Sequence, residues 1–250
     1  MDTAEQSAPN NEPVRDTAPA RKKNLPIGPL AAEFIGTFLL AGVIITTSGQ
    51  PLYIFLAIAA LVAILGGISG AHLNPALTIG AAMVRRLTPL RALGYILAQI
   101  IGAMLAFITL SWLLGGVPDQ PNAVTGQMQQ AELFKAAALT EGKEWYAFFA
   151  EILGASILGF AVAHALTEKR ERFTSAFSVA GGLMIGLILA GSTAILNPAV
   201  ALSLQALKFE LWPIAVHVIA PIIGAIIGFL IFKLVEKSTP QEPAAQPIES

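Results

Sequence analysis

The sequence predicts an all-α membrane protein with six transmembrane helices plus two re-entrant half-helices in an inverted repeat. Three observations predict this fold class. The 250 residues are 55% hydrophobic and only 12% charged, whereas a soluble domain carries about 25% charged residues, which excludes an ordinary globular or disordered protein. Six apolar stretches are long enough to cross a bilayer core of about 30 Å. Two shorter apolar segments begin with the same tripeptide, Asn-Pro-Ala.

The six predicted spans follow one another along the chain. Each has about the 20 apolar residues that a helix needs to cross the bilayer. Thr88 and Pro89 supply an N-cap and a first-turn proline for the third span. The predicted spans cover residues 29–48, 52–69, 89–114, 145–167, 174–193 and 211–235.

The basic residues predict the orientation in the membrane. If six spans alternate, twelve Lys and Arg residues fall on the side of both termini and three fall on the other side. Cytoplasmic loops carry an excess of Lys and Arg, so we expect an integral protein of the plasma (inner) membrane with both termini in the cytoplasm. The twelve are Arg15, Arg21, Lys22, Lys23, Arg85, Arg86, Arg91, Lys169, Arg170, Arg172, Lys233 and Lys237, and the three are Lys135, Lys143 and Lys208.

Two leftover segments, residues 74–84 and 197–207, are too short to cross the membrane. In each, an asparagine followed by a proline marks a helix start. The first ends at Arg85 on the side of the termini and the second at Lys208 on the other side. Each segment is therefore predicted to be a half-helix, and the two enter from opposite faces. The two boxes are Asn74-Pro75-Ala76 and Asn197-Pro198-Ala199.

An internal repeat explains the opposite faces. The segment Ala32-Glu33-Phe34-Ile35-Gly36 matches Ala150-Glu151-Ile152-Leu153-Gly154, and each half contains three spans and one half-helix. An odd number of spans per half inverts the second half in the membrane. The predicted organisation is a disordered cytoplasmic N-terminal tail (1–28), a first repeat (29–114), an external connecting loop (115–143), a second repeat (144–236) and a cytoplasmic C-terminal tail (237–250).

The paired boxes, the segment that leads into the first of them from Ser69, and the repeated glutamate segments resemble the aquaporin (major intrinsic protein) family over about residues 30–235. The resemblance implies a passive membrane channel for water and/or small neutral solutes, for example hydrogen peroxide, urea, ammonia or glycerol, that excludes protons and ions. It implies a homotetramer in the lipid bilayer with one pore per subunit. It implies no enzyme chemistry, catalytic residue, cofactor, metal or nucleic acid.

Asn74 and Asn197 are the first candidates for pore residues. Two half-helices from opposite faces can meet at mid-membrane, where each N-terminus concentrates about half a positive charge and each asparagine offers amide donors. The alternative is a plain N-cap asparagine in each loop. By resemblance, the polar ladder along the pore is formed by the carbonyls of Gly70, Ala71, His72, Thr193, Ala194 and Ile195.

Glu33 and Glu151 are carboxylates within spans, and intramembrane charge is costly and usually functional. They can serve as a proton relay or as a scaffold that accepts backbone N–H groups of the re-entrant loops, and the symmetry of the pair favours the scaffold. His72 is expected to face the cytoplasmic half of the pore. His164 and His217 are expected to be ordinary helix residues.

The resemblance also places a selectivity filter, counted back from the two boxes, at Ile54, Ile185, Ala194 and Val200. The family usually has arginine where this chain has Val200. Its water-selective pattern has a histidine in span five and an aromatic residue in span two, and its glycerol pattern has Arg-Asp after the second box. This chain matches neither, and it partly resembles plant vacuolar members that share the valine.

Two other classes of protein stay open. A secondary transporter can also have inverted repeats and broken helices. The segment Gly66-Gly67-Ile68-Ser69-Gly70 contains the Gly-x-Ser-Gly pattern of a membrane serine protease, although it runs directly into the first box. The absence of cysteine excludes disulfides, thiolate catalysis and thiolate metal sites.

Overall fold

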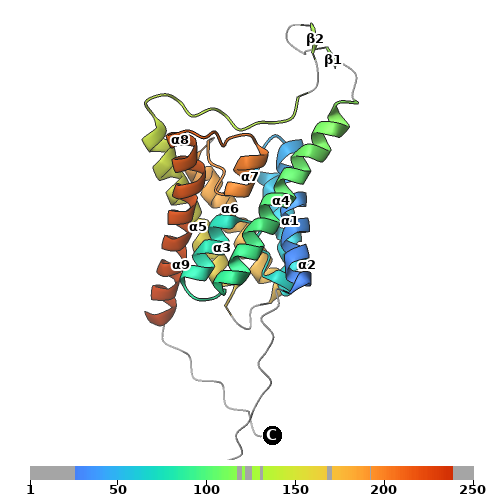
Figure 1. Cartoon of the computed structure of the whole chain (residues 1–250). Coiled ribbons are helices and arrows are strands. Elements are labelled where there is room, and N and C mark those ends of the chain that lie inside the picture. The colour runs from blue at the N-terminus through green and yellow to red at the C-terminus, as the bar shows by residue number, and fades with distance from the viewer. Residues whose placement is uncertain are drawn as a thin grey trace, which may run out of the picture.

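A computed structural model describes residues 26–116, 120–121, 126–129, 132–167, 171–191 and 193–238. Most of both predicted tails, and six of the twelve basic residues that predicted the orientation, lie outside these ranges. Six long helical segments surround two short helices (Figure 1). The long segments are α1 Ile27–Thr46, α2 Pro51–Ser69, α4 Pro89–Leu114, α5 Glu144–Ala165, α6 Arg172–Ala190, and a sixth made of α8 Leu211–Ile214, the π-helical turn η1 Ala215–Ile219 and α9 Ala220–Ser238.

The prediction of six spans is confirmed. All six segments are long and apolar enough to cross a membrane, and each boundary lies within three residues of the predicted one. The apolar side chains on the outside of the bundle, such as Trp112 and Leu230, are exposed. This is the pattern of a bundle that faces lipid.

The two short helices start at the boxes. α3 covers Pro75–Met83 and α7 covers Pro198–Ser203, and the preceding asparagine caps each of them. α7 ends earlier than predicted, because Gln205 adopts a positive φ of 57° that ends the helix. α7 lies toward the end of the bundle that the connecting loop covers, and α3 lies toward the end where α9 finishes (Figure 1).

Glycines at equivalent positions of the two halves allow the helices to pack closely. A Cβ atom at Gly102 in α4 would collide with the carbonyl oxygen of Phe34 in α1, and one at Gly224 in α9 would collide with that of Ile152 in α5. These equivalent contacts are the inverted repeat seen in three dimensions.

The connecting loop returns over one end of the bundle. Two short strands, β1 Gln120–Pro121 and β2 Met128–Gln129, pair antiparallel. Further along, the N–H of Ala136 donates to the carbonyl oxygen of Leu204 at 3.0 Å. The Phe134 ring packs so closely on Gly49 that a Cβ there would lie 3.0 Å from it. The loop is therefore fixed to the helical ends beneath it (Figure 1).

Candidate pore

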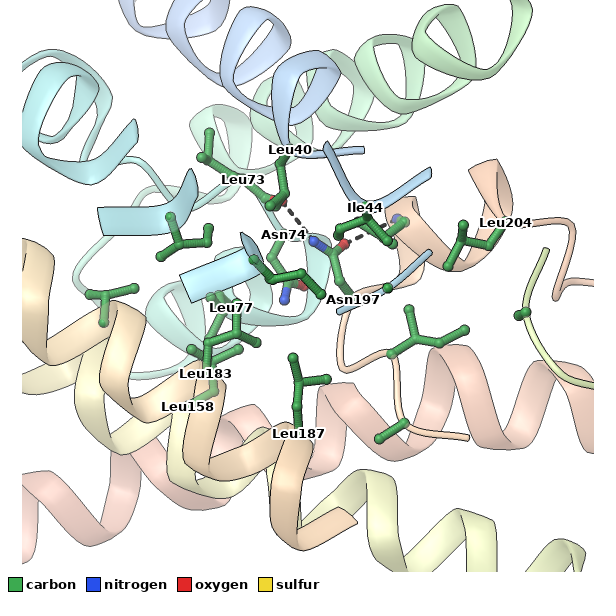
Figure 2. A pocket seen from close by; sticks show the side chains of 18 of the residues that line it. Leu40, Ile44, Leu73, Asn74, Leu77, Leu158, Leu183, Leu187, Asn197 and Leu204 are labelled. Carbon is green, nitrogen blue, oxygen red and sulfur yellow. Dashed lines mark hydrogen bonds between the residues drawn. The ribbon is translucent and has the colours of Figure 1, made fainter. Parts of the chain in front are cut away.

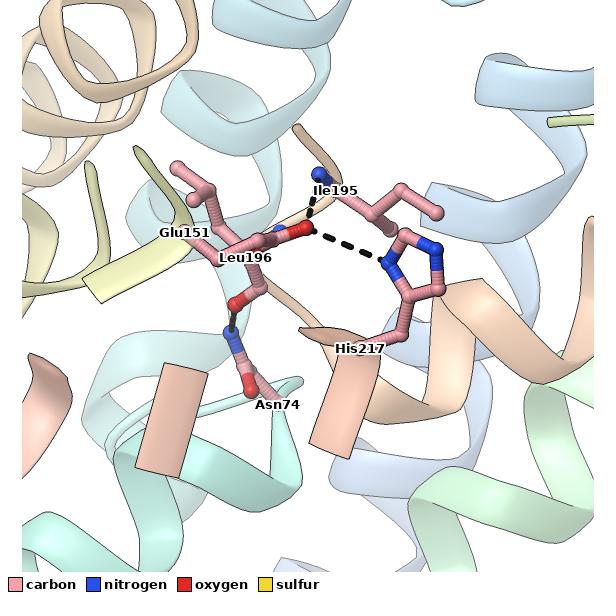
Figure 3. A network of polar contacts seen from close by, with 5 residues as sticks. All are labelled: Asn74, Glu151, Ile195, Leu196 and His217. Carbon is pink, nitrogen blue, oxygen red and sulfur yellow. Dashed lines mark hydrogen bonds and ion pairs between the residues drawn. The ribbon is translucent and has the colours of Figure 1, made fainter. Parts of the chain in front are cut away.

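The two asparagine boxes meet inside the bundle and hold each other. The Asn74 Nδ2 group donates to the Leu196 carbonyl oxygen at 2.8 Å (Figure 3), and the Asn197 Nδ2 group donates to the Leu73 carbonyl oxygen at 2.9 Å (Figure 2). Both asparagines are buried. A side-chain amide has two N–H bonds, so each asparagine keeps one N–H for another acceptor.

The same asparagines begin the half-helices. The Oδ1 atom of Asn74 accepts from the N–H of Ala76 at 2.8 Å, and that of Asn197 accepts from the N–H of Ala199 at 3.0 Å. These N-cap bonds fix the rotation of each side chain. The pore role and the plain N-cap role are therefore compatible. The side-chain oxygen of each asparagine caps a helix, while its nitrogen presents N–H groups.

Glu33 holds the backbone in front of the first box. Its carboxylate accepts hydrogen bonds from the N–H of His72 at 2.9 Å and the N–H of Leu73 at 2.7 Å. The Ser69 hydroxyl and the Gln99 amide donate to it as well, at 2.6 and 2.7 Å. Leu73 has a positive φ of 50°, a conformation that is uncommon outside glycine. The four donors stabilise this strained turn.

Glu151 does the same for the second box (Figure 3). It accepts from the N–H groups of Ile195 and Leu196, both at 2.8 Å, and Leu196 has a positive φ of 59°. Neither glutamate lines the central cavity described below. Their hydrogen bonds favour the scaffold over the proton relay.

His217 is a site residue that the sequence did not reveal. The prediction that it is an ordinary helix residue is wrong, because its Nδ1 atom lies 3.3 Å from the Glu151 carboxylate and its side chain is buried (Figure 3). It lies in η1, a π-helical turn, and such turns are frequent at functional sites. It supports Glu151 as Gln99 supports Glu33.

A central cavity of about 100 Å³ passes the two boxes (Figure 2). Its walls are mostly apolar, with leucine, isoleucine and valine from the long helices. The polar groups come from Asn74, Asn197, His72 and the irregular backbone before each box. Such backbone is tolerated at membrane depth where it lines a cavity. The predicted carbonyl residues that line it are Ala71, His72, Thr193, Ala194 and Ile195, whereas Gly70 lines the vestibule instead.

Three of the four predicted filter residues line this cavity, namely Ile54, Ala194 and Val200. The prediction for Ile185 is wrong, because its side chain is 52% exposed on the outside of the bundle, while Leu187 lines the cavity. Two residues along a helix correspond to a rotation of about 200°, so these two side chains point to opposite sides of α6. Counting back from Asn197 assumed a longer loop than the one that follows Ala190.

A second cavity, here called the vestibule, adjoins the first at His72. It measures about 590 Å³, and His72 lines both cavities. The other vestibule residues are Ser69, Gly70, Arg86, Leu87, Arg91, Leu166, Thr167 and Glu236. At the opposite end, Phe134, Ala136 and Ala137 of the connecting loop line the central cavity, which sequence reasoning missed.

The Ser69 hydroxyl holds the loop before the first box through two hydrogen bonds. It donates to Glu33 at 2.6 Å and accepts from the N–H of Ala71 at 2.9 Å. This arrangement fixes the turn before the first box. Within the described ranges, no cluster of three His, Asp or Glu side chains could hold a metal ion.

Residues 22–232 match the family model described as Major intrinsic protein. The chain belongs to the major intrinsic protein family. It is an integral membrane protein and a channel for water or small solutes, not an enzyme.

The relatives of this major intrinsic protein agree with the fold. It is 29% identical to Nodulin-26 of Glycine max over 222 residues, which cover 82% of this chain and 77% of the relative. It is 30% identical to Aquaporin-1 of Ovis aries over 188 residues, which cover 72% and 64%. The X-ray structure of the aquaglyceroporin from Plasmodium falciparum has the same fold, with a TM-score of 0.61, 22% identity and coverage of 85% of this chain and 99% of the other.

Proposed function

We propose that the channel passively conducts water together with small neutral solutes, such as hydrogen peroxide, urea, ammonia or glycerol, and excludes protons and ions. The observation that carries the proposal is the pair of asparagines, Asn74 and Asn197, each of which donates to the backbone carbonyl just before the other's box, in a mostly apolar cavity. A cavity of about 100 Å³ holds only a few water molecules. Solute therefore passes the asparagines nearly in single file.

Proton exclusion follows from the free N–H groups of the asparagines. A water oxygen that accepts from both amides directs its own hydrogens away from the centre, which breaks a continuous water wire. The N-terminal ends of α3 and α7 add positive potential there. Because α7 has only six residues, we assign most of the effect to the asparagine amides.

The proposed filter consists of Ile54, Leu187, Ala194 and Val200, with Leu187 in place of Ile185. None of these side chains offers a hydrogen bond or a charge. A solute that enters loses part of its hydration, and an unmet polar group costs about 1–3 kcal/mol. Strongly hydrated solutes are therefore disfavoured more than weakly hydrated ones.

A stopped-flow panel in proteoliposomes tests this proposal. Wild type should conduct water and at least one of the neutral solutes, with a flux linear in the solute gradient and indifferent to pH and sodium gradients. A flux that depends on either ion gradient would instead support the secondary transporter.

The substitution Val200→Arg tests the filter itself. The guanidinium should narrow the opening and lower the flux of urea or glycerol several-fold more than that of water. The measurement is the ratio of solute to water permeability, with Ile185→Arg as the control on the outer face of the same bundle. A ratio that stays constant or rises in the Val200 variant would mean that Val200 is not at the constriction.

Three wider features belong to the same proposal. We propose that the subunits form a homotetramer with one pore each, that both termini are cytoplasmic in a plasma (inner) membrane, and that residues 29–114 and 144–236 act as the two repeats. Crosslinking in native membranes and protease access to tagged termini test the assembly and the orientation. If a terminal tag is cleaved only from outside, the orientation is reversed.

A further inference from the structure

We infer that Arg91 supplies the fixed positive charge that keeps cations out of this pore, and that it does so from the vestibule rather than from the filter. The inference rests on the proposed channel function. Its starting point is the central cavity, where Val200 stands in place of the arginine that the family resemblance predicts. His72 is the one titratable side chain among the described residues that line that cavity.

The vestibule contains charge, but most of it is internally balanced. Arg86 lies 3.8 Å from the Glu236 carboxylate and donates to the Leu166 carbonyl oxygen at 2.9 Å. Two opposite charges at this separation largely cancel for a solute that passes at a greater distance. Arg86 and Glu236 together therefore contribute little net potential.

Arg91 has a neutral partner instead. Its Nε atom donates to the Tyr95 hydroxyl at 2.9 Å, an Nη2 hydrogen bond reaches the same oxygen, and the guanidinium lies 5.1 Å from the centre of the Tyr95 ring. Among the residues that the structure describes, no carboxylate lies within ion-pair distance of it. Its charge is therefore uncompensated where it faces the vestibule.

Arg91 is also held beside the loop that leads to the first box. The Tyr95 hydroxyl donates to the carbonyl oxygen of Ser69 at 2.8 Å, and Ser69 begins the loop that leads to the first box. Arg91 and His72 both line the vestibule, and His72 lines the central cavity as well. The guanidinium thus stands at the entrance to the narrow part of the pore.

The nearest buried negative charge, that of Glu33, lies outside the walls of both cavities. Glu33 accepts four hydrogen bonds behind the loop, and it lines neither the central cavity nor the vestibule. A cation in the vestibule therefore faces the guanidinium in the cavity wall, whereas the Glu33 carboxylate lies behind the loop. At the effective dielectric constant of about 20 near a protein surface, a unit charge within about 12 Å changes an ion's local concentration by at least about tenfold.

The test measures potassium flux and water permeability in the same proteoliposomes. Arg91→Gln should raise potassium flux about tenfold, while Arg91→Lys, which keeps the charge, should leave potassium flux low. The double variant Arg91→Gln with Val200→Arg should lower potassium flux again, because it restores a charge at the filter.

A second pair of variants leaves Arg91 and its contacts in place. Leu87 and Arg91 both line the vestibule, so Leu87→Glu adds a negative charge to the same cavity, and Leu87→Gln is the uncharged match. Potassium flux should rise with glutamate and not with glutamine. Vesicles of Arg91→Gln and Leu87→Glu that conduct water but keep wild-type potassium flux would overturn the inference, whereas wild-type vesicles that conduct neither water nor solute would overturn the proposed function instead.

Discussion

Glu33 accepts four hydrogen bonds behind the first box, and two of its donors are backbone N–H groups at buried positions. Those N–H groups have no helical partner, because the backbone at His72 and Leu73 turns before α3 begins. A buried donor without an acceptor costs about 1–3 kcal/mol. At the residue scale, a side chain that touches no solute therefore determines where the pore carbonyls and the Asn74 amide lie.

Glu33→Ala should therefore destabilise the protein by several kcal/mol, because it leaves at least two buried N–H groups unpaired. The expected result is a lower unfolding temperature in detergent and loss of water flux. Glu33→Gln keeps one carbonyl acceptor and should retain more of both. If the alanine variant unfolds at the wild-type temperature, Glu33 is not the scaffold of the loop.

At the element scale, the helices show what the sequence could predict. The spans and both half-helix starts were predictable because their causes are local: apolar length, and an asparagine cap followed by proline. The position of Ile185 was not, because a rotation about α6 depends on the length of the loop after it. Nor was His217, because a π-helical turn changes which face of the last span a residue occupies and has no sequence signal of its own.

Close packing between α1 and α4 gives a prediction about these elements. Gly102→Ala places a Cβ atom against the Phe34 carbonyl oxygen, so the two helices must separate. We expect a loss of about 1–3 kcal/mol, read as a lower unfolding temperature in detergent. Gly181→Ala in α6 is the matched control, because a Cβ there would have no neighbour within 4 Å. Equal unfolding temperatures in the two variants would contradict the packing argument.

On the scale of the whole molecule, the pore is assembled from parts that are distant in the chain. The two boxes come from different halves, and Phe134 and Ala136 reach the central cavity from the connecting loop. No local pattern in the sequence marks those loop residues, since their place depends on how the loop returns to α7. The pore therefore forms only in the complete bundle, although the sequence patterns that predict the spans and the half-helices are local.

The whole sequence contains no cysteine, and this gives the last prediction. A thiol-directed mercurial has no target in wild type, so water flux should not change when it is added. Leu187→Cys places a thiol in a cavity of about 100 Å³, with room for only a few water molecules, so one bound mercury atom should block most of the flux. Added thiol should restore it.

Ile185→Cys provides the control, because that side chain is 52% exposed on the outside of α6 and mercury bound there leaves the pore open. Flux through this variant should stay at its untreated value. If the mercurial inhibits the wild-type channel and added thiol reverses the inhibition, the expectation that wild type offers the mercurial no target is wrong. Inhibition of the residue-185 variant but not of the residue-187 variant would mean that α6 is rotated, and that the filter counted back from Asn197 was right after all.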